Sequence, residues 1–226
     1  MERYHRGFIL FIIYTSIPLA GLSSDIYVPA LPQMASLLQS TSTALQLSIG
    51  IFMLGYAMAQ VIAGPLTDAC KRKTLMLFGS ITSILCIIGI IFIHIIKVIL
   101  VLRFIQGFAL AFQIVPARAM IADLYQGKAF YKHINYSTCA FGLAPIIGPV
   151  LGGILVFYFN WQACFIFILL YSIVILLVLL GTNTNTNNSK KPLSLRKNIL
   201  SYLNLLSHST FMLTTITASL LISTSI

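Results

Sequence analysis

Residues 162–181 read QACFIFILLYSIVILLVLLG, an apolar stretch that carries no acidic or basic side chain. A helix of about 20 such residues is long enough to cross the hydrocarbon core of a bilayer. The stretch therefore predicts a membrane-spanning helix, and the rest of the chain shows how many others accompany it.

The whole chain has the composition of a membrane protein. Hydrophobic residues make up 58% of it and charged residues 8%, and the mean hydropathy is +0.96, whereas water-soluble domains are roughly half apolar and a quarter charged. With loops of about 10 residues, a chain of 226 residues has room for about seven spans. The predicted spans are the six apolar runs 7–28, 44–65, 74–94, 98–121, 134–157 and 162–181.

Directly after residue 181 the chain changes character. Residues 182–198, TNTNTNNSKKPLSLRKN, are polar and then basic, which is typical of a linker and not of a buried segment. A seventh apolar run begins near Phe211 and continues to the end of the sequence, which makes it short for a full span. We predict three segments, which are a six-helix bundle in 1–181, a cytoplasmic linker in 182–208 and the truncated start of a seventh membrane helix in 209–226.

The positive charges are unevenly divided between the two ends of the predicted spans. With six spans, Lys97 is the only lysine or arginine in a loop on one side. Because basic residues near a membrane stay in the cytoplasm, we expect a cytoplasmic N-terminus and linker, and the formal charge of +10 indicates topology rather than nucleic-acid binding. The cytoplasmic set comprises Arg3, Arg6, Lys71, Arg72, Lys73, Lys128, Lys132, Lys190, Lys191, Arg196 and Lys197.

The ionisable residues Asp25 and Arg103 fall inside predicted spans. Such a residue costs about 2.5 to 3.5 kcal/mol on insertion and normally faces the bundle interior or a water-filled cavity. Counted at about 1.5 Å per residue, the two lie at similar depth in the outer part of the bilayer. One hypothesis is a proton-carrying carboxylate whose proton affinity is tuned by the nearby guanidinium. The alternatives are a purely structural buried pair, or an Asp25 that reaches the outer surface.

A second group of charges is expected near the cytoplasmic surface. Arg118 lies about 22 Å further along the fourth span than Arg103, and Asp123 follows about one turn later. Asp68 and Arg72 stand between the second and third spans. One interpretation is a charge network between the second and fourth spans, with Arg72 paired to Asp123 in one of two conformations. The other is a set of solvated charges that only orient the chain.

The fifth predicted span is rich in glycine and proline. Small residues four apart let another helix approach closely, and prolines inside a span free carbonyl groups and introduce a kink. We expect this helix to pack tightly and to bend, with generic packing as the plainer explanation. Its glycines and prolines are Gly142, Pro145, Gly148, Pro149, Gly152 and Gly153.

Four stretches of this sequence resemble the major facilitator superfamily and, within it, drug exporters of the bicyclomycin- and chloramphenicol-resistance type. Residues 64–73, GPLTDACKRK, are similar to the loop motif G-x-L-x-D-[RK]-x-G-[RK]-[RK], from which Ala69 and Lys71 depart. The fifth span is similar to the antiporter motif G-x-x-x-G-P-x-x-G-G, with Ala144 at its first glycine. The other two stretches are DIYVPALP at 25–32 and LRFIQG at 102–107, the latter followed by Ala117-Arg118-Ala119 and Asp123-Leu124.

The resemblance implies an all-α membrane protein with the six-helix N-terminal bundle of a major facilitator fold and part of a seventh helix. In that fold the substrate cavity lies between two such halves. The resemblance also implies proton coupling at Arg103 together with Asp25, and an antiporter helix in the fifth span. Finally it implies a conformational switch, to which we assign Gly64, Asp68, Arg72, Arg118 and Asp123.

The function expected from these features is proton-coupled export of drug-like small molecules across the cell inner membrane. The chain is expected to act with a C-terminal half or a second copy rather than alone. Transport of a metabolite and a non-functional gene fragment are the alternatives. An enzyme acting on lipids is disfavoured, because the few acidic residues form no catalytic cluster in the sequence. The cysteines and histidines lack metal-ligand spacing, so we expect no metal and no cofactor.

Overall fold

A computed structural model describes residues 2–182, 212–214 and 217, with side chains from residue 7 onward. Two compact units divide the chain, Met1–Lys190 and Lys191–Ile226, and all the elements discussed below belong to the first unit. The predicted linker 182–208 and the predicted seventh helix 209–226 lie almost wholly outside the described residues, so both stay predictions.

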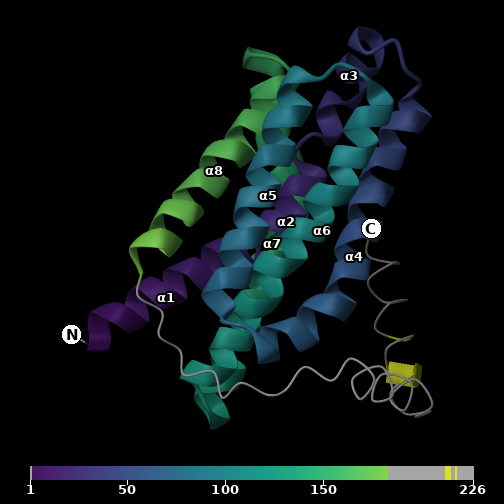
Figure 1. The fold of residues 1–226 in the computed structure, drawn as a ribbon. Coiled ribbons are helices and arrows are strands. Elements are labelled where there is room, and N and C mark those ends of the chain that lie inside the picture. The colour runs from purple at the N-terminus through teal and green to yellow at the C-terminus, as the bar shows by residue number, and fades with distance from the viewer. Residues whose placement is uncertain (1, 183–211, 215–216, 218–226) are drawn as a thin grey trace. The chain divides into compact units, whose positions relative to one another are not determined.

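All regular secondary structure in the described residues is helical, which confirms the all-α prediction. The elements are α1 (Glu2–Ser16), α2 (Leu19–Asp25), η1 (Val28–Ala30), α3 (Leu31–Leu37), α4 (Ser42–Ala69), α5 (Arg72–Phe92), α6 (Ile96–Leu124), α7 (Gly127–Tyr158) and α8 (Trp161–Gly181). Among the described residues, six stretches are long and apolar enough to cross a membrane, in the predicted order. The α4–α5 and α6–α7 connections lie toward the end of the bundle at which α1 begins, and α3 lies at the other end (Figure 1).

The first membrane stretch, Gly7–Leu37, is a series of short helices rather than the single helix expected there. Pro18 separates α1 from α2, because proline has no N–H to donate to the preceding turn. Beyond α2, Pro29 and Pro32 stand in the first turns of η1 and α3, a position that proline favours. The break leaves the C-terminal end of α2 inside the protein, where Tyr27 is fully buried.

Helix α6 is the centre of the packing, because glycines let α4 and α5 lie directly against its backbone. A Cβ on Gly55 of α4 would stand 2.3 Å from the carbonyl oxygen of Phe104, and a Cβ on Gly107 of α6 would stand 2.1 Å from that of Phe52. On the other side of α6, a Cβ on Gly79 of α5 would stand 2.5 Å from a carbonyl oxygen of α6. Real Cβ atoms essentially never come within 3.0 Å of another heavy atom in this way, so all three contacts depend on glycine.

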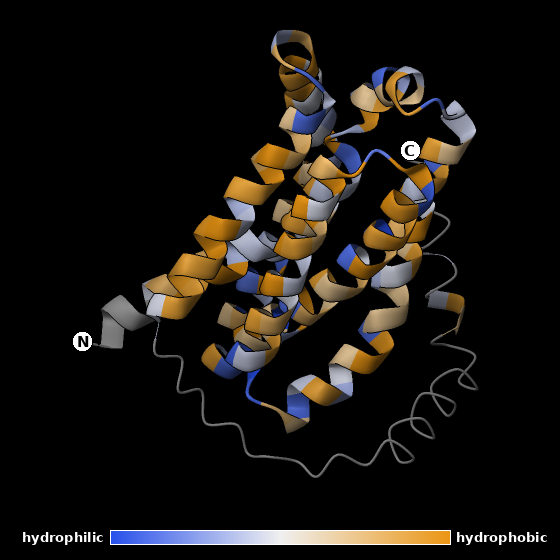
Figure 2. Cartoon of the chain, turned by 45° about the horizontal axis from the view of Figure 1, so that its top comes forward, coloured by the Kyte–Doolittle hydropathy of each residue, from blue (hydrophilic) through white to orange (hydrophobic). Residues whose placement is uncertain are grey.

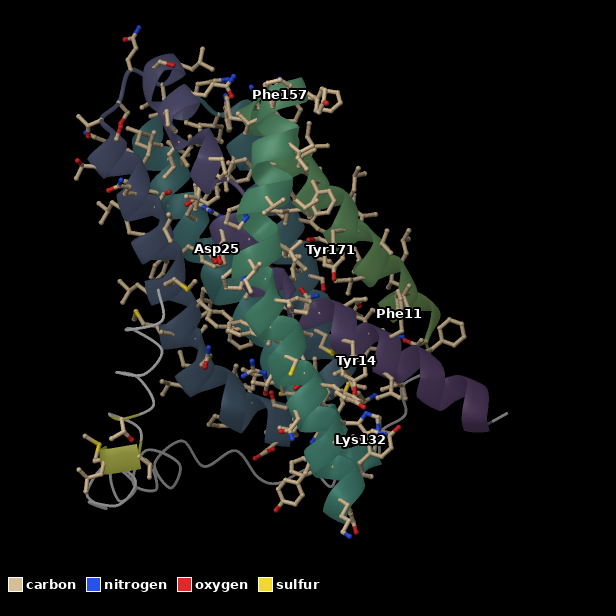
Figure 3. All side chains as sticks on the ribbon, turned by 180° about the vertical axis from the view of Figure 1, so that it is seen from behind. Phe11, Tyr14, Asp25, Lys132, Phe157 and Tyr171 are labelled. Atoms are coloured by element: carbon tan, nitrogen blue, oxygen red, sulfur yellow. The ribbon has the colours of Figure 1, made fainter. Side chains whose placement is uncertain are left out.

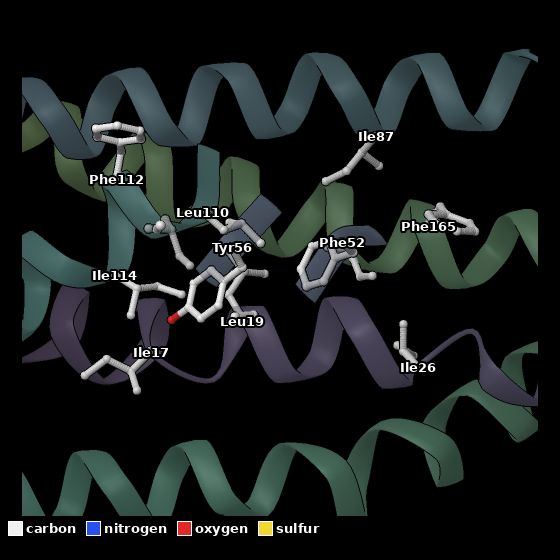
Figure 4. Packing of buried hydrophobic residues seen from close by; sticks show 14 of the residues in the cluster. Ile17, Leu19, Ile26, Phe52, Tyr56, Ile87, Leu110, Phe112, Ile114 and Phe165 are labelled. Atoms are coloured by element: carbon white, nitrogen blue, oxygen red, sulfur yellow. The ribbon is translucent and has the colours of Figure 1, made fainter. Parts of the chain in front are cut away.

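Apolar side chains fill the interior of the bundle and also cover its outside. Figure 4 shows part of the interior, where Ile17, Phe52, Ile87, Leu110 and Phe165 are fully buried. Figure 2 shows hydrophobic residues along most of each long helix, and many of their large apolar side chains are exposed. An apolar exterior of this kind matches lipid hydrocarbon, whereas a water-soluble protein exposes no such continuous apolar surface.

Two tyrosine hydroxyls hold α1 against later helices (Figure 3). Tyr171 on α8 donates to the carbonyl oxygen of Thr15 at 2.8 Å. The hydroxyl of Tyr14 lies 2.5 Å from Nδ1 of His133 on α7, and the His133 ring stacks on Tyr125, with 3.9 Å between the ring centroids. These contacts fix the end of α1 and therefore the position from which α2 begins.

Candidate functional site

Arg103 lies inside the bundle, fully buried, and bonds the end of α2. Both of its terminal nitrogens donate to the carbonyl oxygen of Ser23, at 3.0 Å each, and Nη1 also donates to Oε1 of Gln106 at 3.0 Å. Ser23 belongs to the last turn of α2, where helix carbonyls lack partners within the helix. Arg103 therefore caps α2 at its C-terminal end, where a positive charge also stabilises the helix dipole.

Three aromatic rings surround the Arg103 guanidinium. The carbon Cζ lies 4.1 Å from the ring centroid of Tyr27, 5.0 Å from that of Phe52 and 5.4 Å from that of Phe165. The ring faces attract the cation and so offset part of the free energy needed to remove it from water. The Tyr27 hydroxyl is fixed in turn by a 2.7 Å hydrogen bond with Ser48 on α4. Within the described part of the chain, no acidic group lies at ion-pair distance from Arg103.

Asp25 is the last residue of α2 and faces a different neighbour. Its carboxylate accepts a 2.8 Å hydrogen bond from Ser24 Oγ, and its side chain is half-buried. Its Cβ lies 3.3 Å from the position that a Cβ on Gly148 of α7 would take, and Figure 3 shows it beside α7. The C-terminal end of α2 is therefore held from two sides, because Asp25 packs against α7 and Arg103 on α6 bonds Ser23. Asp25 and Arg103 form no ion pair with each other.

Two glycines of α7 form its closest approach to α2. A Cβ on Gly152 would stand 1.7 Å from the carbonyl oxygen of Ile26, and Gly148 lies against Asp25. The other two glycines predicted to act in this helix, Gly142 and Gly153, have no atom within 4 Å of their Cβ positions. Of the glycines in this motif, Gly148 and Gly152 therefore form the side of α7 that packs against α2 and Ile26.

The prolines of α7 do not interrupt it, because the helix is continuous through Pro145 and Pro149. Pro145 and Ala144 lie against α2, where a Cβ on Gly21 would stand 3.8 Å from Cδ of the proline and 2.7 Å from Cβ of the alanine. Ala144 stands at the first glycine position of the antiporter motif. The close approach of α2 and α7 at this point is possible because the opposing residue on α2 is the glycine Gly21.

Gly152→Val is expected to destabilise the bundle by about 3 kcal/mol, because the new side chain would overlap the backbone of Ile26, directly after α2. Thermal unfolding of the purified chain in detergent measures the loss. Gly153→Val is the matched control, since it makes the same change in helix propensity where the Cβ meets open space. Equal melting temperatures for the two variants would show that α7 does not pack on α2 in this way.

At the end of the bundle where α1 begins, Arg72 and Asp123 form an ion pair. The pair joins the first residue of α5 to the last turn of α6, and it is the only ion pair among the described residues. Asp68 is exposed at the end of α4, and Gly64 is half-buried about one turn earlier. The predicted pairing of Arg72 with Asp123 is therefore present in this structure.

A cysteine pair tests this proximity. In a chain whose four native cysteines are replaced, Arg72→Cys with Asp123→Cys is expected to give a high yield of product with a short bifunctional thiol reagent, because the two side chains are in contact. Lys71→Cys with Asp123→Cys is the control, since Lys71 is exposed just before α5 begins. Equal yields from both pairs, on a gel that separates the linked form, would argue against the ion pair.

Arg118 lies apart from this ion pair. Its side chain is exposed, and its Cζ stands 5.5 Å from the ring centroid of Phe141 on α7. Among the described residues, no ion pair reaches its guanidinium. The five residues that we assigned to one switch therefore occupy more than one place, with Arg72 and Asp123 together and Arg118 beside α7.

Lys73 has a role that the sequence did not reveal. Its Nζ donates to the carbonyl oxygens of Thr182, at 2.6 Å, and Leu180, at 3.2 Å, and so caps the end of α8. Ser23 and the three rings around Arg103 were missed as well, although Tyr27 belongs to the stretch DIYVPALP that carries part of the resemblance. The part of the chain that the structure describes contains no group of three metal-ligating side chains.

The Major Facilitator Superfamily model matches residues 13–226 of this chain. Among curated proteins, the bicyclomycin resistance protein homolog of Haemophilus influenzae is 30% identical over 189 residues, which are 84% of this chain and 47% of that protein. Multidrug resistance protein D of Escherichia coli is 28% identical, over 75% of this chain and 43% of its own length. The chloramphenicol resistance protein of Pseudomonas aeruginosa is 29% identical, over 66% and 36%. The chain thus spans less than half the length of these relatives.

A solved structure shows a similar fold. The human organic anion transporter MFSD10 superposes with a TM-score of 0.60 and 18% sequence identity, over 79% of this chain and 47% of that chain. At this identity the likeness concerns the arrangement of the helices only.

Proposed function

Because the chain belongs to the Major Facilitator Superfamily, we propose that it supplies the N-terminal half of a proton-coupled exporter of drug-like molecules, in a bacterial inner membrane with its N-terminus in the cytoplasm. Relatives named for resistance to bicyclomycin, chloramphenicol or several drugs support this substrate class. The observation that carries proton coupling is the half-buried carboxylate of Asp25 at the interior end of α2.

Proton binding at Asp25 would act on the helix that carries it. A carboxylate that takes up a proton loses its charge, and an uncharged group is accommodated more easily beside α7 inside a membrane. Since Arg103 bonds Ser23 in the same turn of α2, a displacement of that turn is passed on to α6. A ligand shifts a conformational equilibrium only by its different affinity for the two conformations, and the α2–α7 contact supplies such a difference.

The ion pair between Arg72 and Asp123 fits a switch at the cytoplasmic surface. It ties α5 to α6, and we assign it to one of the two access conformations, with the pair separated in the other. Gly64 and Asp68 at the end of α4 stay part of this proposal, because they precede the short connection to Arg72.

A second half is part of the proposal because α7 is poorly covered. Of its most apolar window only 17% is buried, against at least 33% in each of the other five membrane stretches. Its exposed side chains include Leu143, Ile146, Val150 and Ile154. We propose that a C-terminal half, or a second copy of the chain, covers this exposed face of α7.

Export driven by a pH gradient tests the whole proposal. In a host that lacks related exporters, the chain expressed alone is expected to confer no resistance, whereas co-expression with the C-terminal half of the Haemophilus influenzae relative raises its membrane abundance and lowers chloramphenicol accumulation. A protonophore should abolish the difference. Resistance from the chain alone would contradict the need for a partner, and export that a protonophore does not affect would contradict proton coupling.

A further inference from the structure

We propose that Arg118, Phe141 and Tyr56 form a binding position for the negatively charged, aromatic part of a substrate. This inference rests on the proposed export function and names the class of compound that this half of the protein recognises. It gives Arg118 a role in binding instead of the role in the switch that the sequence suggested.

The charge of Arg118 is the first reason. The structure describes three arginine side chains, and two of them have polar partners, because Arg72 pairs with Asp123 and Arg103 bonds a backbone carbonyl. The third, Arg118, is exposed, and among the described residues its guanidinium reaches no carboxylate. Arg118 lies inside a membrane stretch, about 9 Å from the end of α6 at Leu124 when counted at about 1.5 Å per residue. An anionic partner at that depth would lower the free energy of its charge.

The surroundings of Arg118 are aromatic and come from two other helices. Phe141 on α7 presents its ring 5.5 Å from the guanidinium carbon. Tyr56 on α4 is buried (Figure 4), and its hydroxyl lies within electrostatic range of the same guanidinium. Arg118 therefore has aromatic neighbours on α7 and α4, while its own side chain is exposed.

This combination selects for a particular chemistry. A carboxylate or sulfonate can accept two parallel hydrogen bonds from a guanidinium, which is among the strongest polar contacts available to a ligand. An aromatic ring attached to that anion gains area against Phe141. A cationic compound would be repelled by Arg118 and gain only the ring contact.

The position is separate from the proposed proton site. Phe141 and Gly148 are seven residues apart on α7, which corresponds to about 10 Å along the helix, and Asp25 faces Gly148. A bound anion at Arg118 on α6 and a proton at Asp25 on α2 would thus lie beside different positions along α7.

Calorimetric titration of the purified full chain, in detergent free of phospholipid, tests the inference. The probes are naphthalene-2-sulfonate and naphthalene-2-sulfonamide, which share a ring system and differ in charge. The sulfonate is expected to bind about tenfold more tightly than the sulfonamide. Arg118→Gln should remove that difference, Arg118→Lys should keep part of it, and Phe141→Leu should weaken both probes. Lys132→Gln is the control, because Lys132 is also an exposed cation near a ring, 5.7 Å from the centroid of Tyr136.

Three outcomes would overturn the inference, given variants with the helical circular dichroism of the parent. One is equal binding of the two probes, or none, by the parent chain. Another is an equal loss of sulfonate binding in Lys132→Gln. The third is displacement of the sulfonate by added phosphatidylglycerol, with the same dependence on Arg118, which would assign the position to a lipid headgroup. The titration involves no proton gradient. A failure of proton-driven export would therefore not change the binding result, and a failure of binding would not change the export result.

Discussion

An Asp25→Asn variant, assembled with the proposed second half, is expected to lose all export driven by a pH gradient. Asparagine has the shape of aspartate and can still accept the hydrogen bond from Ser24, but it cannot take up and release the proton. Since Asp25 is the one carboxyl group that lies far from the ends of its membrane stretch, among the stretches that the structure describes, no neighbouring acid can replace it. Uptake of labelled substrate into proteoliposomes, with and without an imposed pH gradient, measures the loss.

The control for this variant is exchange of substrate across the same membrane without net proton movement. That exchange needs the two conformations but not a titrating carboxyl, so Asp25→Asn should retain it, and Asp25→Glu should regain part of the driven export. Undiminished export in the asparagine variant would remove Asp25 from the mechanism.

The second large effect is expected from Arg103→Ala, which should both destabilise the bundle and stop transport. The substitution leaves the buried carbonyl oxygen of Ser23 without its donor, which costs about 1 to 3 kcal/mol, and it empties the space between three rings. The end of α2 that carries Asp25 then has no anchor on α6. Melting temperature and pH-gradient-driven uptake are the two measurements.

Arg103→Lys separates charge from geometry. Lysine keeps the positive charge and the contact with the rings, but a single ammonium group lacks the planar fork that bonds Ser23 and Gln106 together. We expect partial recovery of stability, and a pH profile of transport that differs from that of the parent chain. Lys97→Ala, at an exposed cation on the same helix, should change neither. Full activity in Arg103→Lys would reduce the role of Arg103 to charge balance.

The sequence predicted the spans well because apolar length is a property of the chain alone. It also placed Asp25 and Arg103 at similar depth, since depth follows from a count of residues. It could not predict which neighbours Asp25 and Arg103 would contact, because those contacts depend on the break at Pro18 and on how α2 packs against α6 and α7. The guanidinium therefore bonds the backbone at Ser23, where the sequence suggested a partner in Asp25.

The glycines of α7 show the same limit. Spacing by four identifies residues on one side of a helix, and it grouped Gly148 with Gly152 correctly. It could not distinguish them from Gly153, which belongs to the same motif and has open space around it. A distinction of this kind requires the position of the opposing backbone, here that of Ile26, which no spacing within α7 contains.

The hydrogen bonds from Lys73 to the end of α8 bear on how the bundle is made. Lys73 and Leu180 are 107 residues apart in sequence, and at about 5 to 20 residues per second a ribosome needs about 5 to 20 seconds to synthesise the chain between them. During that interval the carbonyl groups that Lys73 bonds have not yet been synthesised. An α5 that enters the bilayer in that time would place the basic residues at its start among lipid headgroups, so the lipid composition of the leaflet on that side should influence how many nascent chains close their bundle.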